Sequence, residues 1–175
     1  NILTVNVTGT TNKKTLNITS DLPTTKKKKK NLEIKASTAR VSGDINKEFT
    51  NSVTIDAGYT SPSLPHASDI TVKHSLSTYN AGAKADKLTV ESGASITTVN
   101  MGAGNDTISL KAGANAGGNT AAAKVTNINA GAGDDTLELA TVASNNIQNS
   151  GDYTTIKSIT GIETIKLTGA NNPTS

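Results

Sequence analysis

Short segments in which polar and aliphatic residues alternate recur along most of this chain. Period-two alternation gives a β-strand one buried face and one solvated face. The pattern predicts an all-β protein with strands at Leu3–Val7, Thr15–Ile18, Asn31–Ile34, Ser52–Ile55, Asp69–Val72, Lys87–Val90, Thr107–Leu110, Thr136–Leu139 and Thr164–Leu167.

The spacing of these segments favours a coil. Starting from Leu16, their first apolar residues are separated by 16, 21, 17, 18, 20, 29 and 28 positions. Several steps lie near the length of about two nonapeptide half-turns. The longer steps suggest loops that leave the coil, above all the polar, glycine-rich residues 111–120. Repeats at this spacing favour a parallel β-solenoid, a β-roll or β-helix, with an antiparallel β-sandwich as the alternative.

Helices are not expected, because Gly, Thr, Asn and Ser dominate and are poor helix formers. The chain has 175 residues and a net charge of +3, which is unevenly distributed. Residues 1–50 carry ten Lys and Arg against four Asp and Glu, whereas residues 101–175 carry four against six. We therefore expect an irregular basic strand region over 1–85 that continues into a β-roll with glycine-aspartate motifs over 86–175. Both could form one continuous domain, 1–175.

Two segments of the second half are nearly identical. Gly102-x-Gly104-x-Asp106 and Gly131-x-Gly133-x-Asp135 are each followed by a Thr-aliphatic-x-Leu strand. A third copy ends in Glu163 and has lost its first glycine, so it is expected to cap the array without a full metal turn.

Stacking the first two motifs would produce a site for a hard cation. Calcium takes six to eight oxygen ligands, commonly carboxylates and backbone carbonyls, and two stacked turns can supply that number. Winding in one sense would make Asp106 and Asp135 neighbours around a shared ion. The alternative is a metal-free turn in which the Asp side chain bonds to its own backbone. The predicted metal-site residues are Gly102, Gly104, Asn105, Asp106, Gly131, Gly133, Asp134 and Asp135.

Residues 101–109 and 130–138 resemble the nonapeptide G-G-x-G-x-D-x-U-x of the RTX family of secreted calcium-binding β-rolls. Met101 and Ala130 replace the first glycine, which leaves the carbonyl ligands expected at those positions in question. The strands around Gly161 look like those of bacterial surface-layer proteins and large secreted adhesins. The resemblance implies a bacterial protein that is exported without an N-terminal signal and folds outside the cell with calcium.

Other features narrow the range of functions. The absence of cysteine excludes disulfides and thiolate zinc sites. No apolar run is long enough to span a membrane. Lys26–Lys30 could contact lipopolysaccharide or another anionic glycan, although such a run is more often a solvated loop. No aromatic residues interleave with it, so nucleic acid is not expected as a partner.

We find no Ser/His/Asp set, and no carboxylate pair outside the glycine turns, that would suggest catalysis. We therefore expect no enzyme activity. The leading hypothesis is a calcium-rigidified building block that associates with itself in a surface layer or fibre at the cell surface. The rival is a stalk or adhesive segment of a larger type I-secreted RTX adhesin or toxin.

Overall fold

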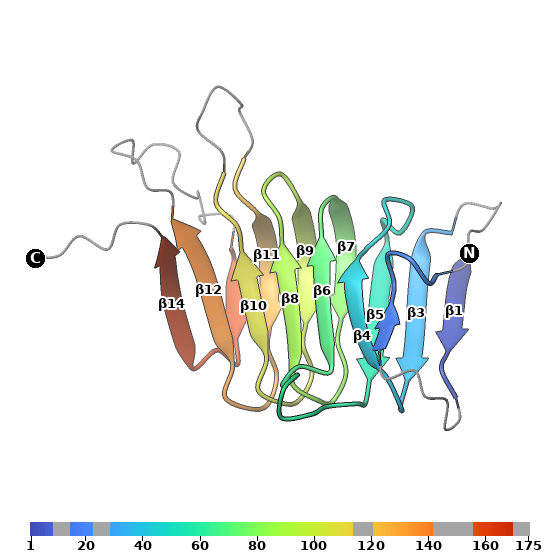
Figure 1. Ribbon diagram of the computed structural model, residues 1–175. Helices are drawn as coiled ribbons and strands as arrows, with labels where there is room; N and C mark the ends of the chain where they lie inside the picture. The colour runs from blue at the N-terminus through green and yellow to red at the C-terminus, as the bar shows by residue number, and fades with distance from the viewer. Residues whose placement is uncertain (9–14, 23–28, 114–120, 142–155, 170–175) are drawn as a thin grey trace, which may run out of the picture.

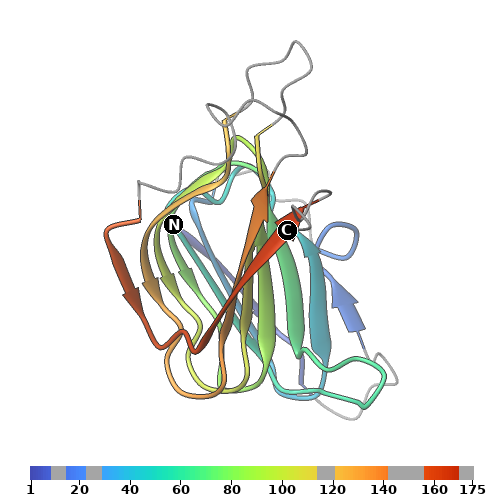
Figure 2. The same ribbon diagram turned by 90° about the vertical axis from the view of Figure 1, so that its left-hand side faces the viewer.

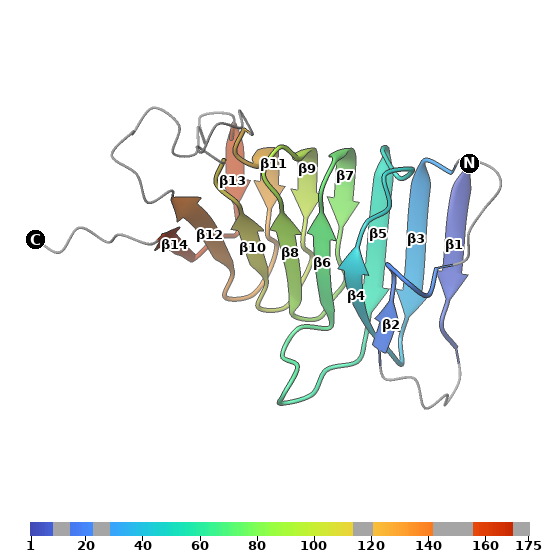
Figure 3. The same cartoon turned by 45° about the horizontal axis from the view of Figure 1, so that its top comes forward.

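The chain forms a two-sheet coil in which all strands of a sheet run in the same direction (Figure 1). The computed structural model describes residues 1–8, 15–22, 29–113, 121–141 and 156–169. Each turn of the coil contributes one strand to each sheet, so odd and even strands alternate along the molecule (Figure 3). The N-terminal strand β1 and the C-terminal strand β14 lie at opposite ends (Figure 1).

Two seven-stranded sheets, called sheet A and sheet B here, face each other across the core. The strands of sheet A are, in spatial order, β1 (Ile2–Asn6), β3 (Asn31–Ala36), β5 (Ser52–Ala57), β7 (Ser75–Asn80), β9 (Ser95–Asn100), β11 (Lys124–Asn129) and β13 (Ser158–Thr160). The strands of sheet B are β2 (Thr15–Asn17), β4 (Arg40–Asp44), β6 (Ser68–Val72), β8 (Asp86–Val90), β10 (Thr107–Leu110), β12 (Thr136–Thr141) and β14 (Thr164–Gly169).

The predicted parallel β-solenoid is confirmed. All twelve strand pairings of the described residues are parallel, which is incompatible with the alternative of an antiparallel sandwich. Seen along the coil axis, the strands of each sheet stand behind one another (Figure 2). Within the described part of the chain, no helix is long and apolar enough to cross a membrane.

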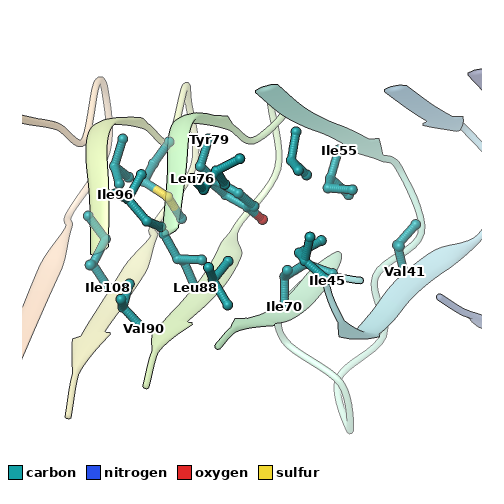
Figure 4. Packing of buried hydrophobic residues seen from close by; sticks show 14 of the residues in the cluster. Val41, Ile45, Ile55, Ile70, Leu76, Tyr79, Leu88, Val90, Ile96 and Ile108 are labelled. Carbon is teal, nitrogen blue, oxygen red and sulfur yellow. The ribbon is translucent and has the colours of Figure 1, made fainter. Parts of the chain in front are cut away.

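Inward side chains stack in register to form a narrow aliphatic core. Leu88, Ile108 and Leu137 occupy one such column in sheet B, and each is 0% exposed. Facing columns from sheet A, with Ile55, Tyr79 and Ile96, close the core from the other side (Figure 4). Burying each large aliphatic side chain contributes about 1.5–3 kcal/mol, so the aliphatic core formed by these columns is the main stabilising element of the coil.

Several strands of sheet A were missed by the alternation pattern. The inward residues of β7, β9 and β11 are three positions apart, namely Leu76 and Tyr79, Ile96 and Val99, and Val125 and Ile128. Two outward residues lie between each pair, so a period of two does not detect them. The strand β4 was also missed, because a glycine occupies one of its inward positions and leaves no second aliphatic residue to show the alternation.

The spacing between the first apolar residues of the predicted strands combined steps within one sheet with steps from one sheet to the other. Steps of 18, 20, 29 and 28 do join neighbours in sheet B, from Ile70 to Ile165. The steps of 16 and 17, in contrast, lead from one sheet to the other, because Leu32 and Val53 belong to sheet A. The boundary expected near residue 85 falls between β7 and β8, and both sheets continue across it.

Candidate metal centre

The two glycine motifs form the turns from β9 to β10 and from β11 to β12, which are adjacent along the lower edge of Figure 1. Thr107 is in register with Thr136, and an isolated parallel bridge joins Ala103 to Ala132. Residues 29 positions apart in sequence are therefore stacked directly above each other, as the spacing predicted.

Glycine is required in these turns for two reasons. Gly102 and Gly131 both have φ of 99°, and Gly104 and Gly133 have φ of 113° and 143°, a region that L side chains rarely adopt. In addition, a Cβ on Gly131 would overlap the carbonyl oxygen of Gly102. The turns are thus packed backbone against backbone, with room for no side chain between them.

A column of carboxylates runs along this edge and connects successive coils. Asp106 Oδ1 accepts a hydrogen bond from the Asp86 amide at 2.8 Å, and Asp135 Oδ1 accepts one from the Asp106 amide at 2.7 Å. Glu163 Oε2 continues the column by accepting a bond from the Asp135 amide at 2.8 Å. Each carboxylate therefore binds the backbone of the coil before its own.

The second oxygen of Asp106 and of Asp135, Oδ2, is buried and has no hydrogen-bond partner in the described structure. Asp106 is 2% exposed and Asp135 is 1% exposed. Leaving a buried carboxylate oxygen without a partner costs about 1–3 kcal/mol or more. These two atoms are the feature of the site that most needs a chemical partner.

Burial also shifts the acidity of these groups. It raises the pKa of Asp106 to about 8, and the carboxyls of Asp86 and Asp135 act in the same direction, while the bond from the Asp86 amide opposes the shift. Burial likewise raises the pKa of Asp135, with further contributions from Glu163 and Asp134. A proton or a bound cation would each relieve the cost of charge at this edge.

The sequence interpretation missed Asp86, which starts the column. Its Oδ1 accepts bonds from the Ser68 amide at 3.0 Å and the Ser68 hydroxyl at 2.6 Å, and its Oδ2 accepts one from the Gly82 amide at 3.2 Å. Burial raises the pKa of Asp86 to about 6, against these three bonds. The available signal was Gly82-x-x-x-Asp86, a copy of the motif in which Lys84 stands in place of the second glycine.

The remaining predicted ligands lie at the periphery of the site. Asn105 and Asp134 are exposed, and Asn105 Oδ1 accepts a hydrogen bond from the Asp134 amide at 3.1 Å. Met101 and Ala130, which replace the first glycine of the nonapeptide, are both 0% exposed and point into the core. These two positions therefore serve packing, which explains why glycine is not needed there.

The lysine run is only partly visible, because Lys26–Lys28 lie outside the described residues. Lys30 is exposed, and its carbonyl accepts a hydrogen bond from the Asn51 amide at 3.0 Å. It borders a shallow polar pocket of about 420 Å³ formed with Asn1, Asn31, Thr50, Asn51 and Ser77. Whether this surface meets an anionic glycan stays a prediction.

Across the described coils, no three His, Cys, Asp or Glu side chains converge as a metal-binding group. A cation at the glycine turns would thus take most of its ligands from backbone carbonyls and water, together with Asp106 and Asp135. Comparison with protein-family models, curated proteins and solved structures found no match to this chain. The interpretation of the site therefore depends on its geometry.

Proposed function

We propose that this chain is a calcium-stabilised structural building block of a bacterial surface layer or extracellular assembly. The observation that carries the proposal is the pair of buried, unpartnered Oδ2 atoms of Asp106 and Asp135 in stacked glycine turns. Carboxylate and carbonyl oxygens are the ligands that calcium prefers. The resemblance of residues 101–109 and 130–138 to the RTX nonapeptide supports the same ion.

Calcium would act through the stability of the coil. An ion that binds the folded turns and not the open chain stabilises the fold by mass action. With a dissociation constant typical of extracellular calcium modules, about 0.1–1 mM, 10 mM calcium would contribute about 1.4–2.7 kcal/mol. The proposed protein would then be rigid outside the cell, where calcium is abundant, and less stable inside it.

Calcium titration of the purified chain tests this proposal. We expect 10 mM calcium to raise the melting temperature measured by circular dichroism, and electron microscopy to show sheets or filaments only with the ion. Magnesium is a matched control, because it demands a smaller octahedral site and should have little effect. No thermal shift with calcium would contradict the metal, and rigid dispersed monomers would favour the stalk segment instead.

The double variant Asp106→Asn, Asp135→Asn is the matched protein control. Asparagine keeps a side-chain oxygen that can accept the amide bonds from the preceding coils, and it removes both buried charges. We expect this variant to fold, to be at least as stable as the wild type without calcium, and to lose the response to the ion.

A further inference from the structure

The outer face of sheet A carries an unbroken array of uncharged polar side chains. Two rows cross five strands from β5 to β13, and we call them together the polar face. One row contains Ser52, Thr78, Thr98, Asn127 and Ser158, and the other contains Thr54, Asn80, Asn100, Asn129 and Thr160. Charged residues border the face without interrupting it: Glu33 of β3 is in register with Thr54, Asp56 and Lys124 lie near the strand ends, and Lys157 precedes Ser158.

The opposite sheet is different. The outward residues of sheet B include both signs of charge, and Arg40 and Asp69 approach to 3.4 Å in a cross-coil ion pair. The other charged side chains on that face are Asp44, Lys87, Glu138 and Lys166. Since both sheets belong to the same coil, the fold itself does not require the ten positions of the polar face to lack charge.

The side chains of the polar face are already ordered. Asn80 Nδ2 donates to Thr54 Oγ1 at 3.2 Å, and Asn100 Nδ2 donates to Asn80 Oδ1 at 2.8 Å. Thr160 Oγ1 donates to Asn129 Oδ1 at 3.3 Å. Side chains held in this way lose little conformational freedom when another surface binds them.

We propose that the polar face is the contact through which two copies of this chain associate. This inference rests on the proposed function as a building block and names the surface that the assembly would use. Hydroxyl and amide groups both donate and accept hydrogen bonds, so the face is complementary to itself. Two copies with a net charge of +3 each can meet there without opposing like charges.

Other occupants fit less well. The ten side chains are all Ser, Thr or Asn, so they lack the aromatic and large apolar groups that line most small-molecule pockets. They also include no Lys or Arg with which to bind nucleic acid phosphates. A second sheet with the same row spacing, by contrast, matches the face along its whole length, as asparagine ladders do between paired sheets.

The size of the face predicts a weak contact. Five strands about 4.8 Å apart and about 17–20 Å long offer roughly 400 Å² on each copy. A stable isolated complex buries about 1,000 Å² or more in total. A single pair of copies should therefore dissociate in dilute solution and hold only within an array, where each copy makes several contacts.

Charge insertion on the full chain tests the inference. In calcium, the double variant Thr78→Lys, Thr98→Lys should raise the critical concentration for assembly by about tenfold or more, because lysines would oppose lysines across the contact. The control Ser42→Lys, Thr71→Lys places the same charge on half-buried outward positions of sheet B and should assemble like the wild type. Circular dichroism and the calcium-dependent melting temperature verify that both variants fold.

A mixing experiment identifies the partner. An equal mixture of the Lys variant with Thr78→Glu, Thr98→Glu should assemble near the wild-type concentration, because opposite charges would then meet. Assembly of the Lys variant alone at the wild-type concentration, or failure of the mixture, would overturn the polar-face contact and leave the building block standing. A wild-type chain that stays dispersed in calcium would instead overturn the proposed function.

Discussion

The carboxylates of the column differ in the number of hydrogen-bond partners that they have. Asp86 has three hydrogen-bond donors from Ser68 and Gly82, whereas Asp106 and Asp135 each keep one buried oxygen without a partner. The proposed calcium ion would therefore act at the second and third corners and not at the first. This difference leads to distinct expectations for substitutions at positions that look equivalent in sequence.

Asp86→Ala should destabilise the protein by about 2–4 kcal/mol, because it leaves the buried donors of Ser68 and the half-buried Gly82 amide without an acceptor. The loss should be the same in calcium and in chelator, as measured by urea unfolding. The exposed Asp56→Ala serves as the control, with a change of less than about 0.5 kcal/mol. A loss seen only with calcium would show that Asp86 belongs to the ion site.

Asp106 and Asp135 should behave as a coupled pair. If one ion contacts both carboxylates, Asp106→Asn alone removes most of the calcium stabilisation, and adding Asp135→Asn removes little more. The measurement is the calcium-induced change in unfolding free energy for the two single variants and the double variant. Strictly additive losses would indicate two independent ions or none.

The acidity of the column predicts how stability depends on pH. Folding raises the pKa of Asp86 to about 6 and that of Asp106 to about 8, above the usual value of about 3.9 for an unfolded chain. Groups with a raised folded pKa favour the fold fully below the unfolded pKa, and this contribution is lost as the pH rises through the folded pKa. The melting temperature in chelator should therefore fall between about pH 4 and pH 9.

Calcium should flatten the upper part of this profile, because a bound cation stabilises ionised carboxylates. The variant Asp106→Asn should also flatten it, since the carboxyl whose pKa is raised to about 8 is removed. An identical decline in wild type and variant would assign the pH dependence to other groups.

At the level of elements, the glycine turns restrict the sequence as strongly as the strands that they join. Gly102 and Gly82 occupy equivalent positions in successive coils, but only Gly102 has positive φ. A Cβ on Gly102 would overlap the Gly82 carbonyl, whereas a Cβ on Gly82 would mainly meet the Asp56 carboxylate, which can move aside.

Gly102→Ala should consequently cost about 2–3 kcal/mol or more, whereas Gly82→Ala should cost less than about 1 kcal/mol. Urea unfolding of both variants in chelator measures the difference without the ion. Equal losses would mean that the backbone contact between the turns is not as close as described.

The elements also show how far a sequence can be interpreted. Strands of sheet B with strict alternation were predicted almost to the residue, and so was the stacking of the two glycine motifs. Strands β7, β9 and β11 were missed because their inward residues are three apart, a spacing shared by helices and bulged strands. Asp86 was missed because Lys84 interrupts the glycine pattern, although the backbone there still places the Asp86 carboxylate where it accepts the Ser68 amide of the preceding coil.

At the level of the whole molecule, the turns of the coil differ in how completely their aliphatic side chains are buried. Fully buried aliphatic columns extend through the middle coils, whereas Ile159, Ile165 and Leu167 of the last coil are 42%, 59% and 74% exposed. In a repeat protein each coil depends mainly on its neighbours, so local stability follows these differences. The proposed ion should act on the coils that contain its ligands and much less on distant ones.

Hydrogen exchange should resolve this gradient. The amides of β6 should be protected equally in calcium and in chelator, because the carboxylate that accepts the Ser68 amide is that of Asp86, outside the proposed ion site. The amides of β10 and β12 should gain protection with calcium. Uniform changes along the whole coil would indicate that it unfolds as one cooperative unit.

The one-way arrangement of the carboxylate column has a further consequence. The carboxylates of Asp135 and Glu163 accept hydrogen bonds from the amides of Asp106 and Asp135 in the preceding coil, whereas the bonds to the following coil are accepted by the main-chain carbonyls of Asp106 and Asp135. Loss of a carboxylate at either corner therefore leaves an amide of the preceding coil unpaired and keeps the main-chain bonds to the following coil. Removing the coil that contains Glu163 would leave the Asp135 amide without its side-chain acceptor, so the edge should loosen from that corner toward the N-terminal coils.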